Sequence, residues 1–175
     1  MDEIILIEPT KDDEEKVADY KQEFLNNGDS MDGTANLRNA KTIDEWLEQL
    51  KSYASEETVP NGYVPSTTYL AIRKSDNKLV GMIDIRHRLN ENLIKFGGHI
   101  GYSVRKSERR KGYAKEMLRL ALLNCKNLNI TDALVTCDFD NIASSKTIIA
   151  NGGVFENEIY DEKDEVMVHR YWIKI

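Results

Sequence analysis

One amphipathic segment constrains the fold of this chain more than any other feature. Apolar residues recur at spacings of three and four along it: Ala114, Met117, Leu118, Ala121, Cys125 and Leu128. This spacing is typical of a helix with one buried face. The segments at residues 99–104 and 133–137, on either side of the helix, read as strands. A helix between two strands predicts an α/β fold.

The rest of the chain extends this sheet in mixed directions. Two capping boxes, Thr10–Asp13 and Thr42–Glu45, predict helices that start there. A helix over residues 142–151 ends at Gly152 and Gly153. Further strands are expected at residues 3–7, 67–73, 79–86, 154–160 and 166–175, and residues 87–96 remain unassigned. Since no linker or repeat divides the chain, we expect a single α/β domain over residues 1–175, with a mixed, mostly antiparallel sheet flanked by helices.

Composition excludes several classes of protein. The mean hydropathy is −0.53, and no apolar run approaches the ~18 residues of a membrane helix, so no membrane partner is expected. The two cysteines, Cys125 and Cys137, lie in apolar segments, which predicts no disulfide and a cytoplasmic location. No close Cys and His spacing suggests a metal site. A net charge of −6 argues against nucleic acid as a partner.

The charge is unevenly distributed. Residues 1–60 hold 16 acidic and 6 basic side chains, whereas residues 61–175 hold 14 acidic and 18 basic ones. The acidic half is either a solvated helical face or a surface that attracts cations. The short run from Arg105 to Lys111 carries five bases and one acid, so it is the candidate for attracting an anion.

This basic run precedes a predicted helix start at Gly112. The first backbone N–H groups of a helix have no intrahelical acceptor, and the helix dipole is positive there. Gly112 has no Cβ to block an approaching phosphate, and Ala114 keeps the next turn small. The spacing fits neither a Walker A loop nor a dinucleotide fingerprint. The segment is therefore either a phosphate site or an ordinary basic helix start.

Two motifs give a more specific reading. The segment Arg109-Arg110-Lys111-Gly112-Tyr113-Ala114 matches the R-x-x-G-x-A form of a pyrophosphate loop, and Asn141-Ile142-Ala143-Ser144 followed by Gly152 matches a second signature about thirty residues on. In this order the motifs resemble those of the GNAT superfamily of acyl-CoA-dependent N-acyltransferases. The resemblance implies two central parallel strands that splay apart around acetyl-CoA.

The resemblance also assigns roles to residues. Backbone groups of Tyr102, Ser103 and Val104 would pair with the pantetheine arm, and the amides of Arg109, Arg110, Lys111, Gly112, Tyr113 and Ala114 would hold the pyrophosphate. Asn141 would bond to the pantetheine arm, and Ser144 would lie beside the CoA, although Asn141 also reads as a plain helix N-cap. The backbone N–H of Val104 is the candidate oxyanion donor.

The chain departs from the family pattern at three positions. Lys106 and Arg110 stand where many members have Pro and Gly, which leaves fewer glycines in the loop. More important, Ile148 occupies the place where members often have a Tyr that protonates the departing thiolate. The usual general acid is therefore missing.

Several side chains remain candidates for proton transfer. His99 is the first choice as base because an unperturbed His pKa of about 6.5 suits that role, and a structural histidine is the alternative. His87 is the next choice, followed by Asp84 and Glu91. Tyr171 or Tyr160 could protonate the thiolate, but Tyr171 also reads as core packing, and water could serve instead. His169 is read as an ordinary strand residue.

The sequence therefore predicts an N-acetyltransferase that moves the acetyl group of acetyl-CoA directly to a primary amine. The acidic N-terminal half favours a small cationic amine or a peptide amine as acceptor. The alternative is a non-catalytic acyl-CoA sensor or interaction domain, which the loss of Tyr at position 148 keeps open. A basic loop for another phosphate ligand or an acidic partner is a third interpretation. A homodimer through the C-terminal hairpin also remains open.

Overall fold

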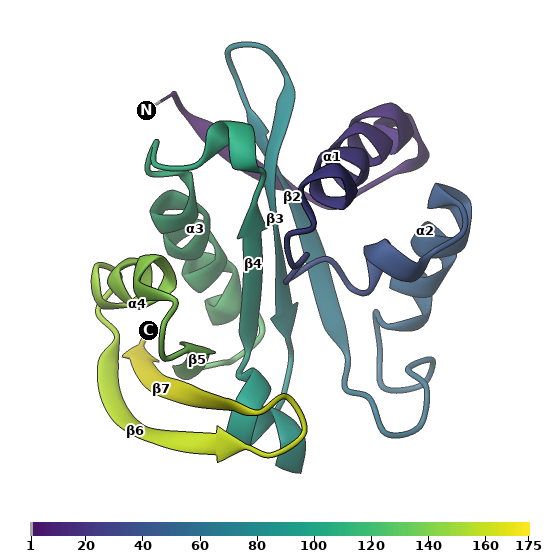
Figure 1. The fold of residues 1–175 in the computed structure, drawn as a ribbon. Helices are drawn as coiled ribbons and strands as arrows, with labels where there is room; N and C mark the ends of the chain where they lie inside the picture. Colours follow the sequence, from purple (N-terminus) through teal and green to yellow (C-terminus); the bar gives the residue numbers. More distant parts are fainter. Residues whose placement is uncertain (1) are drawn as a thin grey trace.

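A computed structural model describes residues 2–175, which form one seven-stranded sheet with helices on both faces (Figure 1). The strands follow the spatial order β1-β2-β3-β4-β5-β7-β6. They are β1 (Ile4–Ile7), β2 (Ser66–Arg73), β3 (Lys78–Arg86), β4 (Ile100–Val104), β5 (Asp132–Asp138), β6 (Val154–Asp161) and β7 (Val166–Lys174). The helices are α1 (Glu14–Asn27), α2 (Ile43–Ser52), α3 (Tyr113–Asn127) and α4 (Ile142–Ile149).

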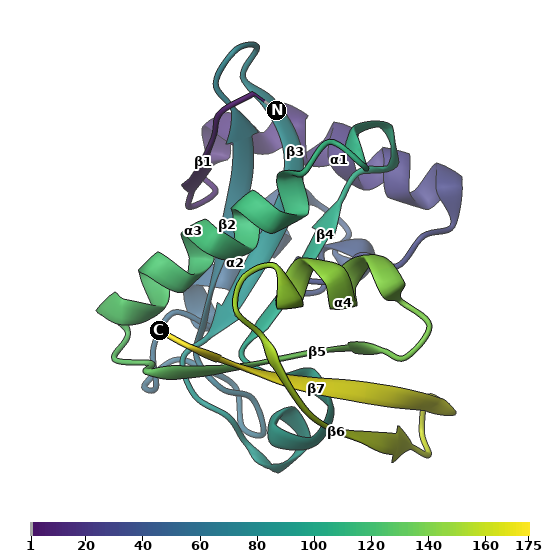
Figure 2. The same ribbon diagram turned by 90° about the vertical axis from the view of Figure 1, so that its left-hand side faces the viewer.

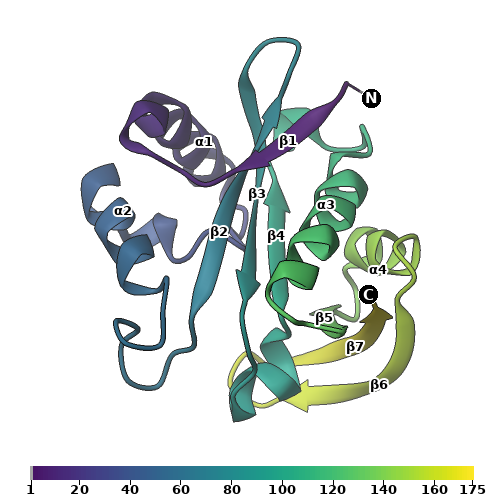
Figure 3. The ribbon, with the colours of Figure 1, turned by 180° about the vertical axis from the view of Figure 1, so that it is seen from behind.

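The helices form two layers with separate cores. Helices α1 and α2 lie on one side of the central strands, and α3 and α4 lie on the other, as Figures 1 and 3 show. The first core contains Trp46 and Tyr20, both fully buried. The second contains Met117 and Leu118 from the predicted apolar face of α3. The helical periodicity of that segment is therefore explained by one continuous contact with the sheet.

The central pair of strands opens like a V. Within the described sheet, β4 and β5 are the one parallel pair, and their register joins Ile100 to Val135 alone. Figure 2 shows β5 and β7 turning away from β4 beyond this point. The predicted fold class, a mixed and mostly antiparallel sheet with two splayed parallel strands, is confirmed.

Local details differ from the sequence prediction at the element ends. The first capping box starts a short 3-10 turn at Lys11–Asp13, and α1 follows it at Glu14. A short π-helical turn, Leu93–Gly97, occupies part of the unassigned segment. Helix α4 ends at Ile149, and Gly152 then takes the left-handed conformation with φ of 88°. Such ends depend on weak terminal bonds, so a shift of a few residues is normal.

Two further expectations concern the whole chain. Across residues 2–175, no helix is both long and apolar enough to cross a membrane. Cys125 and Cys137 are both free and buried, as expected for thiols in apolar segments.

Candidate active site

A groove with a volume of about 630 Å³ lies between the start of α3, strand β4 and the start of α4. Every residue that the resemblance assigns to acetyl-CoA lines it except Lys111: Tyr102, Ser103, Val104, Arg109, Arg110, Gly112, Tyr113, Ala114, Asn141 and Ser144. The two motifs, separated in sequence by α3 and β5, therefore meet around one cavity.

The loop before α3 has the backbone shape of an anion site. Gly112 is the N-cap residue, with φ of 87°, and α3 begins at Tyr113. The first residues of α3 therefore line the groove, and their backbone N–H groups have no acceptor within the helix. These donors and the helix dipole favour a negatively charged group.

Arg110 also takes the left-handed conformation, with φ of 62°. A residue with a Cβ is strained by roughly 1 kcal/mol in the left-handed backbone conformation. Replacing Arg110 with Gly is therefore expected to raise the free energy of unfolding by about 0.5 kcal/mol, because relief of strain outweighs the added freedom of the unfolded chain. Urea denaturation measures this change. Lys106→Gly is the control, because the φ of Lys106 is not positive and this variant should lose stability; a destabilised Arg110→Gly protein would contradict the assignment.

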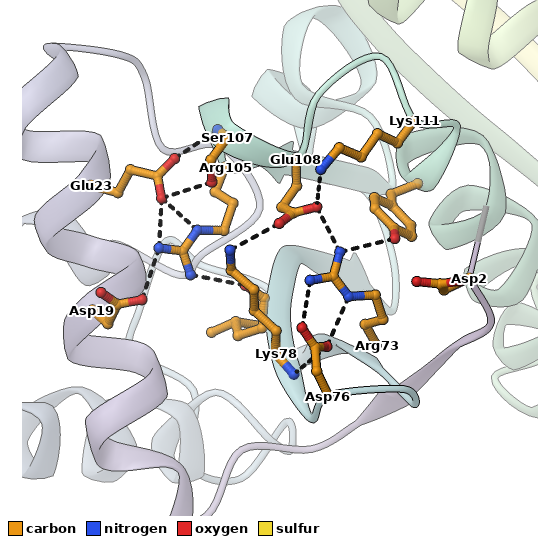
Figure 4. Close-up of polar contacts among 12 residues, drawn as sticks. Asp2, Asp19, Glu23, Arg73, Asp76, Lys78, Arg105, Ser107, Glu108 and Lys111 are labelled. Atoms are coloured by element: carbon orange, nitrogen blue, oxygen red, sulfur yellow. Dashed lines mark hydrogen bonds and ion pairs between the residues drawn. The ribbon is translucent and has the colours of Figure 1, made fainter.

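Glu108 links the loop to the β2–β3 hairpin (Figure 4). Its buried carboxylate lies 2.7 Å from Arg73 Nη1, 2.9 Å from Lys78 Nζ and 2.8 Å from Lys111 Nζ. Burial acts to raise the pKa of Glu108, but the hydrogen bonds from Lys111, Lys78 and Arg73 outweigh it and lower the pKa to about 2. The side chain of Lys111 thus binds the Glu108 carboxylate, and Lys111 is not part of the lining of the groove.

Arg105 links the same loop to α1. Its Nε lies 2.6 Å from Glu23 Oε2 and its Nη2 lies 2.8 Å from Asp19 Oδ2. The Ser107 N–H donates to the other oxygen of Glu23 at 2.8 Å. Three of the five bases in the predicted run, including Arg109 beside Asp29, are therefore paired within the protein. The loop attracts an anion mainly through its backbone.

Asn141 and Ser144 connect α4 to the splayed strands. The Asn141 side chain accepts a hydrogen bond from the Ser144 N–H at 3.1 Å, which is the geometry of an N-cap. The Ser144 hydroxyl lies 2.7 Å from the Tyr102 hydroxyl of β4. Burial raises the pKa of Tyr102 to about 12, so this phenol stays protonated at neutral pH. Together the three side chains hold α4 across the opening of the sheet.

The lining of the groove includes none of the six predicted proton-transfer residues: His99, His87, Asp84, Glu91, Tyr171 and Tyr160. His99 is 8% exposed and lies at the end of β4 where β4 and β5 meet. The backbone N–H of His99 donates to Leu134 O at 2.7 Å, and the ring Nδ1 of His99 accepts from the Leu134 backbone N–H at 3.0 Å. Burial, and then the charge of Arg86, lower the pKa of His99 to about 4. This geometry favours the structural reading of His99, as the residue that fixes where β4 and β5 separate.

His87 and Tyr171 are also engaged within the protein. His87 follows β3, and its Nε2 lies 2.8 Å from the Thr67 hydroxyl. Burial lowers its pKa. Tyr171 is buried on β7, with its hydroxyl 2.8 Å from Ser145 Oγ of α4. Ile148 is fully buried in the core and does not line the groove.

A second cavity, of about 510 Å³, lies on the α1 and α2 side of the sheet. Asp84 and Arg86 of β3 line it, together with Tyr53 and Tyr63, whose rings meet edge to face at 5.4 Å. Asp84 is 5% exposed and accepts from the Thr68 hydroxyl at 2.8 Å. Burial raises the pKa of Asp84.

The sequence did not reveal the segment that separates the two cavities. Residues 29–36, between α1 and α2, line both, and Asp32 is the one residue that the two linings share. In the sequence this segment reads as turn residues that break a helix. Its Asp32-Gly33 pair was the available signal, but this pair does not say where a turn packs.

Comparisons with known proteins show the family of this chain. The family model described as Acetyltransferase (GNAT) domain matches residues 3–154. The chain therefore belongs to the GNAT acetyltransferase family, a class of acetyl-CoA-dependent acyltransferases. Comparison with curated proteins gave no match.

Solved structures of similar fold have low sequence identity to this chain. The ribosomal-protein-S5-alanine acetyltransferase of Vibrio fischeri is 14% identical, with a TM-score of 0.70 over 99% of this chain and 94% of that one. The Microcin C7 self-immunity acetyltransferase MccE, in complex with acetyl-CoA and AMP, is 17% identical, with a TM-score of 0.70 over 100% and 94%. A chimera of the Vibrio cholerae spermidine N-acetyltransferase SpeG and hSSAT is 14% identical, with a TM-score of 0.63 over 98% and 95%.

Proposed function

We propose that the protein is an N-acetyltransferase that moves the acetyl group of acetyl-CoA directly to a primary amine. The observation that carries this proposal is the single groove that joins the Arg109–Ala114 loop, strand β4 and the start of α4. The amides of the loop would hold the pyrophosphate, and the pantetheine arm would lie along Tyr102, Ser103 and Val104. The acetyl thioester would then reach the opening between β4 and β5.

Strand β4 offers a backbone donor for the reaction. The Arg105 N–H donates to Val80 O of β3 at 3.1 Å. Since successive N–H groups of a strand point in opposite directions, the Val104 N–H is directed away from β3, toward the opening between β4 and β5. A donor in this position would stabilise the negative oxygen that forms when an amine attacks a thioester.

The acceptor proposed here is a cationic amine, either a small one or the amino terminus of a peptide. Of the 16 acidic side chains of residues 1–60, Asp32 lines the second cavity, and Asp84 of β3 lines it as well. The similar proteins act, by their names, on a ribosomal protein and on spermidine. A cytoplasmic location, suggested by the two buried free cysteines, belongs to the same proposal.

Thiol release tests this function. Acetyl-CoA is mixed with spermidine, with a peptide that begins with Ala, or with the same peptide blocked by an N-acetyl group, and mass spectrometry identifies the product. We expect thiol release and an acetylated product with at least one free amine, and none with the blocked peptide. For a cationic acceptor, KM should rise severalfold from about 0.05 to 0.5 M salt, because salt screens attraction by the acidic half.

A sensor would behave differently in the same experiment. It would bind acetyl-CoA without releasing thiol to any amine. A KM that does not depend on salt would instead contradict the cationic acceptor, while leaving acetyl transfer in place.

A further inference from the structure

Asp32 occupies the junction between the cofactor groove and the second cavity. It is the residue common to the two linings. A molecule entering through the second cavity would therefore meet a bound acyl group beside this carboxylate. Its place in the segment 29–36, and not in either motif, explains why the motifs alone do not find it.

The backbone at Asp32 is fixed against β4. The Ser103 hydroxyl donates to Asp32 O at 2.6 Å, and the Tyr20 hydroxyl donates to Ser103 O at 3.0 Å. Gly33 packs so closely that a Cβ there would lie 2.1 Å from Gly101 O. Only a glycine allows this approach. Asp32 is thus held next to the strand on which the pantetheine arm is proposed to lie.

The rest of the segment is also well ordered by side-chain bonds. Trp46 Nε1 donates to Thr34 O at 2.8 Å, and Gln49 Nε2 donates to Ala35 O at 2.9 Å. Ala35 and Asn36 have positive φ values of 46° and 63°. Strained residues of this kind persist where the surroundings fix them, and they are concentrated at functional sites. The position of Asp32 is therefore set by the fold.

The charge of Asp32 is not balanced by a nearby cation. Asp29 and Glu108 also line the groove. Asp29 forms an ion pair with Arg109, and Glu108 forms ion pairs with three basic side chains. Asp84, in the second cavity, lies 3.9 Å from Arg86. Within residues 2–175 no basic side chain lies within 4.0 Å of the Asp32 carboxylate, whose one side-chain partner is the Ser30 hydroxyl at 2.9 Å. Of these carboxylates, Asp32 alone is available to a cationic ligand.

Strand β5, on the other side of the opening between β4 and β5, carries negative charge as well. The pKa of Asp138, the last residue of β5, is raised by burial and by the neighbouring charges of Asp140, Asp32 and Asp164. Asp32 and the end of β5 are therefore close enough to interact. A cation at this opening would be favoured from both sides.

We propose that the Asp32 carboxylate binds the protonated amine of the acceptor and holds its nitrogen beside the acetyl thioester. This inference rests on the proposed function. The bound ammonium loses one proton to water, and its nitrogen then attacks the carbonyl carbon. The new C–N bond forms, the C–S bond breaks, the nitrogen loses its second proton, and the thiolate takes up a proton. The net reaction yields the amide, CoA and one proton in solution.

The test compares Asp32→Asn with wild type on two nucleophiles. Spermidine or the Ala-first peptide, whichever wild type uses, is the cationic acceptor, and hydroxylamine is uncharged at neutral pH. Asn keeps the size of the side chain and its acceptor for Ser30, so the fold should be retained. We expect kcat/KM for the cationic acceptor to fall roughly 10- to 100-fold, mainly through KM, since a bond to a charged group is lost. Hydroxylamine acetylation and the KM for acetyl-CoA should change less than about twofold.

The control is Asp12→Asn, which removes the same charge from an exposed residue. Asp12 precedes the N-terminus of α1, whereas Asp32 follows the C-terminus of that helix. It should behave like wild type on both nucleophiles. Equal rates for Asp32→Asn and wild type on the cationic acceptor would overturn the role of Asp32 alone, as would an equal loss on hydroxylamine. A wild-type protein that acetylates neither nucleophile would overturn the proposed function, and this inference with it.

Discussion

Replacing Gly112 with Asp is expected to abolish detectable acetyl-CoA binding. The change adds a Cβ at a residue with φ of 87°, and it places a carboxylate at the N-terminus of α3, where the pyrophosphate is proposed to lie. Repulsion between the two anions replaces the attraction of the helix N-terminus. The dissociation constant should rise at least about 100-fold, which corresponds to roughly 2.7 kcal/mol. Isothermal titration calorimetry measures it.

Gly152→Asp provides a matched control for this variant. Gly152 has nearly the same φ, 88°, and a Cβ there would meet nothing within 4 Å. It follows the C-terminal end of α4 and does not line the groove, so the added charge lies outside the proposed pyrophosphate site. Both variants should lose roughly 1 kcal/mol of stability from backbone strain and keep the wild-type circular dichroism spectrum. Unchanged acetyl-CoA binding in a folded Gly112→Asp protein would contradict the loop assignment.

Replacing Glu108 with Gln is expected to have the largest effect on stability. The carboxylate is 4% exposed and is shared by Arg73, Lys78 and Lys111. Removing one side of such a network leaves the side chain of Arg73, itself 12% exposed, without its buried partner. We expect a loss of about 2–4 kcal/mol, less than for a fully buried pair because the two lysines reach solvent. Urea denaturation at neutral pH measures it.

The control for Glu108 is Glu116→Gln in the first turns of α3. Its pair with Arg119 has side chains that are 24% and 51% exposed, so we expect a loss below about 0.5 kcal/mol. If the two variants lost equal stability, the Glu108 network would not be what holds the loop.

The pH dependence of stability provides a second check on Glu108. Its pKa is about 2 in the folded protein and 4.5 when unperturbed, so the unfolded chain binds the proton more tightly. The stabilisation is therefore present above about pH 4.5 and is lost as the pH falls toward 2. Wild type should lose this part of its stability on acidification, and Glu108→Gln should lack it at every pH.

The cofactor groove was predictable because its parts are local in sequence. The apolar stripe of α3, the glycine before it and the Asn141 cap are each short patterns, and the strand–helix order then brings them together. The fold class followed from the same patterns. The predicted ends of helices and strands were less accurate. A terminal 3-10 turn, such as Lys11–Asp13, differs little in energy from a turn of α-helix, so the sequence does not decide between them.

The junction at Asp32 was not predictable, because it depends on contacts between distant segments. Gly33 packs on Gly101, and no local pattern indicates that approach. The same holds for His99, since alternation along a strand does not reveal that its Nδ1 accepts from the Leu134 N–H. The basic run was likewise visible, but its partners Glu23 and Asp19 come from α1.

Amide hydrogen exchange with and without acetyl-CoA tests the central claim most directly, because it locates the cosubstrate on the protein. We predict that saturating acetyl-CoA slows exchange of the amides from Arg109 to Ala114 and of Val104. Exchange in the β6–β7 hairpin should not change. Exchange that stays the same at the loop, or that slows only elsewhere, would contradict the placement of acetyl-CoA and the function built on it.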